Sequence, residues 1–255
     1  MATAVVVLNL LDTQVRTPVG AAGVGRGSFP VVEVAGLGSN GAHFAPLTAR
    51  LEAAGTTVLD FDPERPGVQP LTYQPASGAE HIPGLAVDVV LPAIRSALVR
   101  AQLDPRTQVV DVVAHSMGGL LMRYLIEHPV HGWDTRVDDL VMVATPNHGS
   151  DVIWWETRLG NGPFKGVGAD MRPGSAFLTS LGYAEPPGQV YTAIGGDPWG
   201  FRWYRFGHHG FDDQVPTESP FLEGAALDTF PSFHGRILLN HDAQDLILAT
   251  LAARP

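Results

Sequence analysis

The sequence has no cysteine, a single lysine, no low-complexity tract and no long apolar run. Without cysteine, disulfides, thiolate metal sites and a cysteine nucleophile are excluded. No apolar stretch approaches the ~20 residues that cross a bilayer, so no integral membrane segment is expected. The net charge of -10 argues against a nucleic-acid partner, because phosphates are bound by basic surfaces. The oligomeric state is left open.

The first residues, MATAVVVLNLLDTQ, are apolar but lack the basic segment and the small-residue cleavage site of a signal peptide. We therefore predict a strand over residues 5–10, followed by a loose glycine-rich segment over 19–30. A cytoplasmic location is expected on this basis. The alternative is secretion, if an export signal has already been removed.

The 255 residues are 45% hydrophobic, enough for one large core, and a single domain over residues 1–255 is expected. Runs rich in β-branched residues alternate with helical patterns. Strands are predicted at 31–35, 56–61, 108–113, 140–144, 190–194 and 226–230, and helices at 44–51, 83–103, 120–128 and 242–251. Gly55 is a plausible end for the first helix, and Pro92 predicts a kink or break in the second. This alternation predicts an α/β fold with a mostly parallel central sheet and helices on both faces, whose reactive site lies at the carboxyl ends of the strands.

The segment over residues 151–173 interrupts this alternation with adjacent tryptophans and many glycines. It predicts an excursion over the top of the sheet, similar to a lid or cap. Trp154 and Trp155 are typical of packing under a long loop. A lid or a wall of the substrate pocket is the alternative.

A serine separates a strand pattern from a helix pattern in VAHSMGG, residues 113–119. A serine hydroxyl becomes a nucleophile when a base takes its proton, and a sharp strand–turn–helix presents it at the edge of the sheet. Ala114 and Gly118 leave room around Ser116, and the helix start places the N–H of Met117 where an oxyanion would form. A helix-capping serine is the alternative interpretation. The whole pattern favours a nucleophile at Ser116.

The stretch VDVVAHSMGGLLMRYLIE, residues 110–127, resembles the nucleophile turn of α/β-hydrolase lipases and esterases. Small lipases of the Bacillus type carry alanine at the position of Ala114. The segment LVMVATPNHGS, residues 140–150, is similar to a strand with a TPxxGS motif in bacterial lipases. The resemblance extends over MRPGSAFLTSL and the closing section, and so covers most of the chain from residue 31 onward.

This resemblance implies the chain order serine, acid, histidine. The acid of the family stands four residues before a proline, which in GFDDQVPTES matches Asp212. Asp197, directly after a predicted strand, and the neighbouring Asp213 are the alternatives. For the base, His234 resembles the late H-G-x-L segment of the family, whereas His241 is better explained as a capping residue at a helix start.

In the family, the second oxyanion donor follows the first core strand, which here corresponds to the backbone N–H of Leu37. His43, Phe44 and the tryptophan pair are proposed to shape the acyl pocket. No cofactor and no catalytic metal are expected: His208 and His209 lie near aspartates in the sequence but lack a metal-ligand spacing.

The resemblance implies a serine hydrolase that cleaves carboxylic esters, of the lipase or carboxylesterase type, acting on a small-molecule or lipid ester. A thioesterase, an amidase or an acyltransferase with the same three residues is an alternative within enzymes. A non-catalytic ligand-binding protein of the same fold is a more remote alternative. Acyl length and the natural substrate are not encoded in any motif.

Overall fold

The computed structural model describes residues 29–128, 136–159, 164–198, 204–205 and 208–253. The strand predicted at residues 5–10 lies outside this part of the chain. Five parallel strands form the central sheet in the order β1-β2-β3-β4-β7. They are β1 (Val31–Val34), β2 (Val109–His115), β3 (Arg136–Val143), β4 (Val190–Gly196) and β7 (Ala226–Phe230). The predicted α/β fold with a parallel sheet is confirmed.

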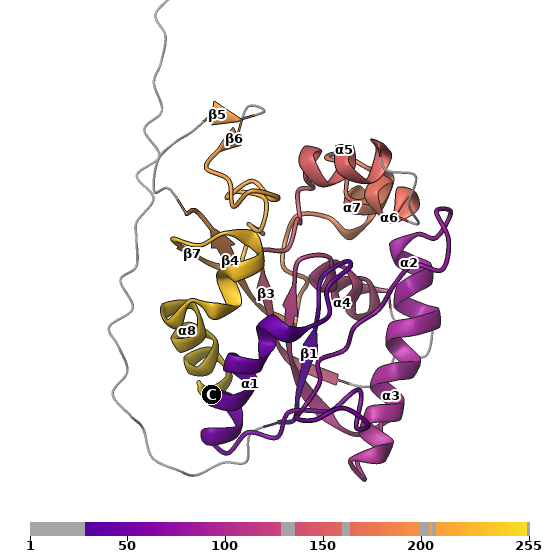
Figure 1. Ribbon diagram of the computed structural model, residues 1–255, viewed down its shortest axis with the longest axis vertical. Coiled ribbons are helices and arrows are strands. Elements are labelled where there is room, and N and C mark those ends of the chain that lie inside the picture. The colour runs from indigo at the N-terminus through magenta and orange to yellow at the C-terminus, as the bar shows by residue number, and fades with distance from the viewer. Residues whose placement is uncertain (1–28, 129–135, 160–163, 199–203, 206–207, 254–255) are drawn as a thin grey trace, which may run out of the picture.

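Both faces of the sheet are covered, which explains why its inner strands are nearly continuous apolar runs. Successive side chains of a strand point to opposite faces, so Val31 and Val113 belong to one core cluster, and Val32 and Val112 belong to the other. Helices α1 (Ala45–Ala53) and α8 (His241–Ala252) cover the first face, and α3 (Leu91–Arg100) and α4 (Met117–Glu127) cover the second (Figure 1). The expected end of α1 is also found, because Gly55 follows it with a φ of 82°.

The predicted helix over 83–103 forms without a break at Pro92. It consists of α2 (Ile82–Leu85), a π-helical turn η2 (Ala86–Val90) and α3. At the end of the π turn, the N–H of Leu91 donates to the carbonyl of Ala86, five residues back. Pro92, which has no N–H, thus enters the first turn of α3, where a missing donor costs little.

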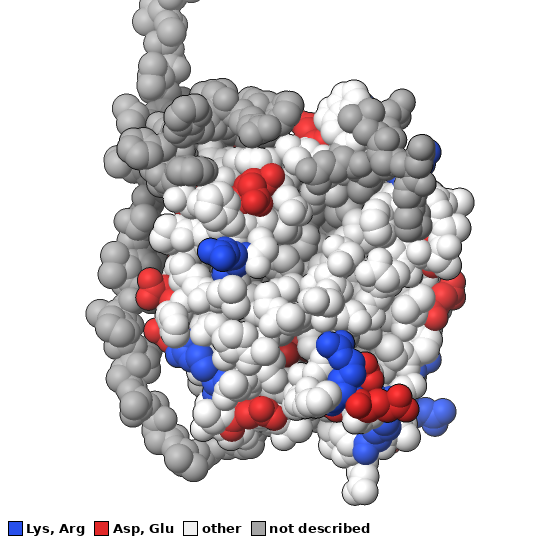
Figure 2. All heavy atoms as spheres, in the orientation of Figure 1, with Lys and Arg blue, Asp and Glu red and all other residues white. Residues whose placement is uncertain are grey.

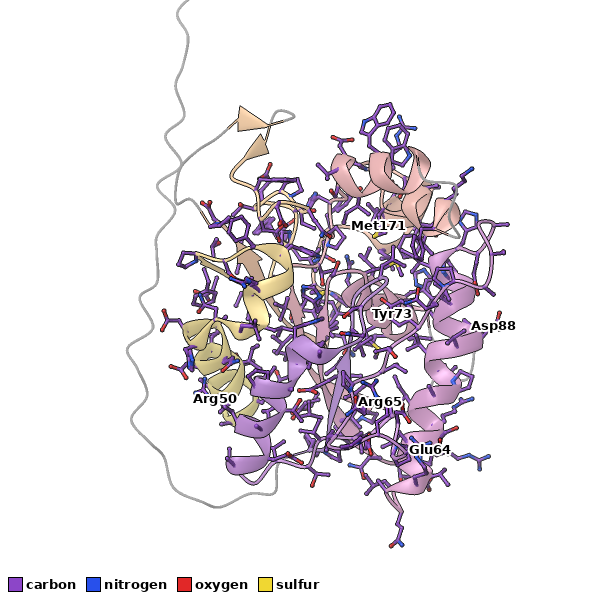
Figure 3. The ribbon with its side chains drawn as sticks, viewed as in Figure 1. Arg50, Glu64, Arg65, Tyr73, Asp88 and Met171 are labelled. Carbon is purple, nitrogen blue, oxygen red and sulfur yellow. The ribbon has the colours of Figure 1, made fainter. Side chains whose placement is uncertain are left out.

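By length and composition, the helix over Ile82–Arg100 is apolar enough to cross a membrane, which for a single helix is weak evidence. Its apolar side chains face the sheet, with Ile82, Leu85 and Ile94 fully buried. On the opposite side, Asp88 points away from the protein core (Figure 3). Packing against the core therefore accounts for the hydropathy of this helix.

The strand predicted at 56–61 is not formed, and this prediction is wrong. Only Val58 pairs, through a single bridge to Val31. The reason is a turn directly after it: the Asp60 carboxylate accepts hydrogen bonds from the N–H groups of Asp62 and Gln69. These local bonds turn the chain before a ladder can extend.

Over the carboxyl ends of the strands lie α5 (Asp151–Leu159), α6 (Lys165–Asp170) and α7 (Ala176–Leu181) (Figure 1). The first two occupy the predicted excursion. Helix α6 is bonded to the loop before α2, because the Gly166 N–H donates to the Gly78 carbonyl at 2.9 Å. The Asp170 carboxylate also accepts from the Ile82 N–H at 2.7 Å. The remaining elements are the 3-10 helices η1 (Ala42–Phe44) and η4 (His234–Leu239) and the short pair β5 (Tyr204–Arg205) and β6 (His208–His209).

Charged side chains of both signs are interspersed on the face of the molecule shown in Figure 2, mainly over its lower half. The described residues on this face form no continuous basic surface. That distribution agrees with the acidic net charge of the sequence.

Candidate active site

Ser116 occupies a strained turn between β2 and α4, with φ 54° and ψ -130°. Few non-glycine residues adopt a positive φ, and such strain is typical of functional positions. Neighbouring glycines make the turn possible: a Cβ at Gly118 would lie 2.7 Å from the Ala35 carbonyl oxygen, and one at Gly119 would lie 2.1 Å from Thr145 Oγ1. The Ser116 side chain makes no capping hydrogen bond to α4. The capping interpretation therefore does not explain this serine.

Ser116, His234 and Asp212 form a continuous hydrogen-bonded chain. His234 Nε2 lies 2.9 Å from Ser116 Oγ, and His234 Nδ1 lies 2.9 Å from Asp212 Oδ2. All three are buried, with exposed fractions of 6%, 3% and 1% for the serine, histidine and aspartate. The N–H groups of Gln214 and Val215 donate to Asp212 Oδ1, at 3.0 and 2.6 Å, and so fix the carboxylate. The structure thus brings together three residues that are far apart in the sequence.

The other two aspartates considered from the sequence do not take the place of Asp212, because the two ring nitrogens of His234 lie within hydrogen-bonding distance of Ser116 and Asp212. Asp197 lies directly after β4, and its N–H donates to the Phe230 carbonyl at 2.8 Å. Asp213 has a φ of 86°. Burial, together with the neighbouring Asp212, raises the pKa of the Asp213 carboxyl. The turn over 212–215 therefore directs the first of its two aspartates to the histidine.

The remaining histidines have other environments. His241 begins α8, where Asn240 is the capping residue, because its side chain accepts from two helical N–H groups. His148 donates to the Phe221 carbonyl at 3.1 Å and stacks on Tyr183. The side chains of His208 and His209 lie outside the described residues.

Among the described residues, one acidic group is compact enough to share a metal ion. Asp111, Asp138 and Asp139 have carboxylate oxygens within 4.8 Å of one another. They lie on the first halves of β2 and β3, whereas Ser116 follows the last residue of β2. Acidic groups of this kind are common without a metal, and the chain of Ser116, His234 and Asp212 does not include them.

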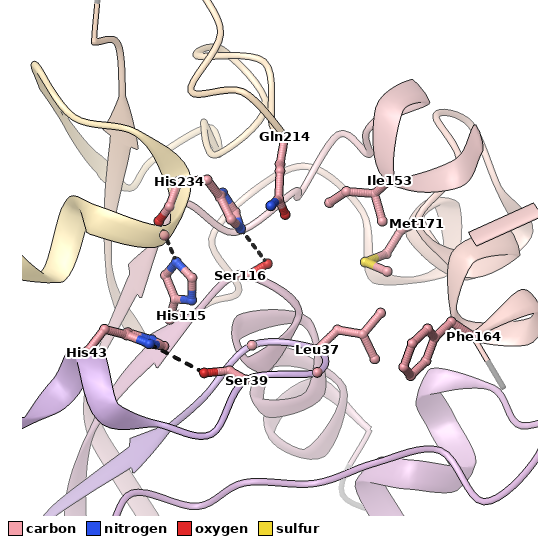
Figure 4. Close-up of a pocket in the computed structure, with 13 residues that line it drawn as sticks. Leu37, Ser39, His43, His115, Ser116, Ile153, Phe164, Met171, Gln214 and His234 are labelled. Carbon is pink, nitrogen blue, oxygen red and sulfur yellow. Dashed lines mark hydrogen bonds between the residues drawn. The ribbon is translucent and has the colours of Figure 1, made fainter. Parts of the chain in front are cut away.

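Ser116 opens into a cavity of about 400 Å³ with two unlike sides (Figure 4). One side, here called the histidine wall, consists of His43, His115 and His234. The other side, here called the apolar wall, consists of Leu37, Ile153, Phe164 and Met171. Gln214 lies between the two walls on the side of the cavity opposite Ser39 (Figure 4). An apolar lining with a few convergent polar groups is the usual composition of a small-molecule site.

The pocket residues predicted from the sequence are only partly found there. His43 lines the cavity, but Phe44 is fully buried in the core beside α1. Trp154 lines a separate hollow of about 550 Å³ between α5 and α7, with the Arg172 guanidinium 4.8 Å from its ring centre. Trp155 contacts Trp154 edge to face and is 45% exposed. None of these three aromatic residues lines the cavity at Ser116.

The sequence did not predict the apolar wall. Of its residues only Leu37 was predicted to lie at the site, as a backbone N–H donor to the oxyanion. Ile153 precedes the tryptophans on α5 and is buried, whereas Trp155 is exposed. The amphipathic pattern of this helix was the available signal, because it resembles that of the core helices α3 and α4. Phe164 and Met171 lie on either side of α6, in a glycine-rich stretch without a regular period.

The backbone beside the serine comes from the start of α4 and from the turn after β1. Met117 is the first residue of α4, and the first N–H groups of a helix have no partner within it. Leu37 is the second residue of a turn that the Ser39 N–H closes on the Gly36 carbonyl at 3.2 Å, and the φ of 68° at Gly38 suits that turn. Gly36 lies so close to Ser116 that a Cβ on it would be 2.9 Å from the serine Cβ. Both residues predicted as oxyanion donors therefore lie beside the serine.

No curated protein matches the chain by sequence. The profile of a family described as a domain of unknown function, DUF7379, matches residues 93–154, which include β2, Ser116 and α4.

Solved structures are similar over most of the chain. Phospholipase PlaB from Legionella pneumophila matches with a TM-score of 0.69 at 16% identity, over 89% of this chain and 60% of that one. The mature form of the Bacillus licheniformis lipase BlEst2 gives a TM-score of 0.61 at 16% identity, over 92% and 96%. The product of the gene lin2722 from Listeria innocua gives 0.57 at 14% identity, over 89% and 95%. At such identities the likeness shows a common fold, and this chain spans less than two thirds of PlaB.

Proposed function

We propose that this chain, which has the α/β-hydrolase fold, cleaves carboxylic esters through an acyl intermediate on Ser116. The observation that carries the proposal is the buried hydrogen-bonded chain from Ser116 through His234 to Asp212. A serine, a histidine and a carboxylate in this order form the arrangement that activates a serine hydroxyl for acyl transfer. The lipase and phospholipase among the similar structures support the same class of reaction.

The first half of the reaction uses His234 twice. As Ser116 Oγ attacks the ester carbonyl carbon, its proton passes to His234 Nε2, and the carbonyl oxygen gains the negative charge. The same proton then passes to the alcohol oxygen, the carbon–oxygen bond breaks, and the acyl group stays on Ser116. Asp212 accepts the Nδ1–H throughout, which fixes the tautomer and stabilises the imidazolium. Water repeats both steps and releases the acid.

The backbone N–H groups of Leu37 and Met117 are proposed to bind the oxyanion. Their donors are held by the turn after β1 and by the start of α4, so they need little rearrangement as the charge develops. Loss of one such donor typically costs about 10²–10³ in rate.

The two walls of the cavity support a placement of the two halves of the ester. The leaving alcohol takes a proton from His234 Nε2, so it lies on the side of the histidine wall, with Gln214 near by. The acyl chain then points toward the apolar wall, where burial of each methylene group contributes about 0.8 kcal/mol. We infer an ester with an apolar acyl chain and a polar alcohol, of the carboxylesterase or lipase type.

The test compares the purified chain with two serine variants. Ser116→Ala is expected to abolish labelling by a fluorophosphonate probe and to lower kcat on chromogenic esters by about 10⁶-fold. Ser96→Ala, at an exposed position on α3, is the matched control and is expected to change neither. Melting temperatures of both variants should equal that of the unmodified chain within a few degrees.

Parallel assays on esters, thioesters and amides with the same acyl chain identify the reaction class. Faster turnover of the thioester or amide would replace the ester hydrolase proposal by the corresponding enzyme. If the unmodified chain takes no label and turns over none of the three, a non-catalytic binding protein becomes the better interpretation.

A further inference from the structure

His115 is a buried histidine beside the nucleophile that the proposed reaction does not use. It precedes Ser116 at the end of β2 and is 4% exposed. Its ring centre lies 4.8 Å from that of His234 and 4.9 Å from that of His43, so it occupies the middle of the histidine wall (Figure 4). A buried polar residue at this position requires a reason, since an apolar side chain avoids the cost of desolvation.

The hydrogen bond of His115 defines its protonation. His115 Nε2 lies 3.0 Å from the main-chain carbonyl oxygen of His234, and a carbonyl only accepts, so Nε2 carries the proton. Burial, with the nearby His234 and His43, lowers the pKa of His115 well below its usual range, and the ring is neutral. Nδ1 is then a bare acceptor. It is buried without a partner among the described residues, against Gly36.

The backbone of His234 is therefore held on both sides. Its carbonyl accepts from His115, and its N–H donates to the Asp212 carbonyl at 2.7 Å. The first bond ties His234 to the residue before Ser116, and the second ties it to Asp212. Ser116 and Asp212 are also the two side-chain partners of its imidazole ring. The imidazole ring itself spans Ser116 and Asp212 at 2.9 Å each way. A shift of the His234 backbone by a fraction of an ångström would lengthen one of those bonds.

We propose that His115 is a positioning residue for His234: its Nε2–H holds the main-chain carbonyl of the base and so keeps the imidazole in line with Ser116 and Asp212. The proposal deepens the proposed hydrolase function and rests on it. It also explains why a histidine with one unpartnered nitrogen is kept in the core. The Nε2–H bond, rather than the bulk of the ring, is the feature that matters.

Three substitutions separate the hydrogen bond from packing. In His115→Gln the amide nitrogen stands as many bonds from Cβ as Nε2 does, so it can reach the carbonyl of His234. In His115→Asn the amide nitrogen stands where Nδ1 was and is too short to reach it. His115→Phe keeps the aromatic ring and removes the donor. Each variant is assayed below its own melting temperature, so that unfolding does not enter the rates.

We expect His115→Phe and His115→Asn to lower kcat about 10- to 100-fold, the scale of a small misplacement of a catalytic group. KM is expected to stay within about twofold, because His115 is only 4% exposed and acts on the base rather than on the substrate. His115→Gln should restore most of the lost kcat. The proposal is overturned if the Gln and Asn variants have the same kcat, or if the Phe variant is as active as the unmodified chain.

A spectroscopic measurement keeps this test independent of turnover. The Nδ1–H proton of His234, shared with Asp212, gives a far-downfield proton resonance in NMR spectra. It is expected to be sharp in the unmodified chain and in His115→Gln, and shifted or broadened in His115→Phe. If no ester is cleaved but the resonance responds in this way, the hydrolase function fails and the positioning role stands. A resonance that is identical in all three proteins would overturn the positioning role whatever the activity.

Discussion

The two walls of the cavity are built in different ways. The histidine wall is fixed by polar contacts: His43 to Ser39 at 3.3 Å, His115 to the His234 carbonyl, and His234 to Ser116 and Asp212. The apolar wall comes mainly from the region of α5 and α6, and its side chains meet the cavity through shape alone. Directional bonds suit the atoms that react, whereas non-directional packing suits a chain of methylene groups. Substitutions that disturb the histidine wall should therefore change kcat. Substitutions in the apolar wall should change the preferred length of the acyl chain.

Among the substitutions that act on the two walls, the largest loss of kcat is expected when Asp212, the partner of His234, is made neutral. Asp212→Asn keeps the shape of the side chain but favours the wrong tautomer of His234, and kcat is expected to fall about 10⁴-fold. Asp213→Asn is the matched control, because asparagine tolerates the φ of 86° at that position. Steady-state kinetics on one ester substrate measure both. Equal losses in the two variants would contradict the assignment of Asp212.

A second, smaller effect is expected beneath the histidine wall, at Glu33 on β1. Its carboxyl is fully buried, and burial raises its pKa to about 8. Thr48 Oγ1 lies 2.7 Å from Glu33 Oε2 and 3.1 Å from the carbonyl of Phe44, next to His43. The threonine hydroxyl donates to Glu33, which lowers the pKa of the carboxyl against the larger effect of burial. Thr48 thus lies between Glu33 and η1, which carries His43.

The pH dependence of stability follows from this raised pKa. Between the unfolded pKa of 4.5 and about 8, only the folded chain holds the proton, so stability falls as pH rises. The slope approaches about 1.4 kcal/mol per pH unit, and it disappears above pH 8. Glu33→Gln removes the titration, so its stability relative to the unmodified chain should increase from pH 5 to pH 8.

Urea unfolding at several pH values measures this difference. Glu64→Gln, at an exposed position, is the control and should follow the unmodified chain at every pH. Parallel stability curves for Glu33→Gln and the unmodified chain would show that Glu33 is ionised in the folded state.

The smallest effect is expected on the apolar wall. Phe164→Ala enlarges the cavity, so kcat/KM for short acyl chains should fall about 10-fold while the preferred chain becomes longer. Trp155→Ala is the control, because that side chain is exposed and does not line the cavity. A series of esters with increasing acyl length measures the preference. A change in overall rate without a change in the preferred length would place the acyl chain elsewhere.

The parts of the site that sequence reasoning identified are those with local patterns. Ser116 follows a valine-rich strand and precedes paired glycines, and both features depend on neighbours in the chain. The failed predictions depended on contacts that the hydrophobic period does not reveal. The strand predicted at 56–61 does not form because the Asp60 carboxylate bonds to the backbone of Asp62 and Gln69 and turns the chain. Phe44 does not line the cavity because it belongs to the core cluster that also contains Val113 and Val141.

By itself the sequence determined the parallel α/β sheet, the strained turn at Ser116 and the absence of thiol chemistry. Hydrophobic period and turn composition are local properties, so they can be read from consecutive residues. The tertiary structure decided which of three aspartates meets His234, which side chains form the apolar wall, and what His115 holds. Each of these depends on separate segments meeting at the carboxyl ends of the strands, as His115 and the His234 carbonyl do across 119 residues of sequence. Only packing of the whole core decides that placement.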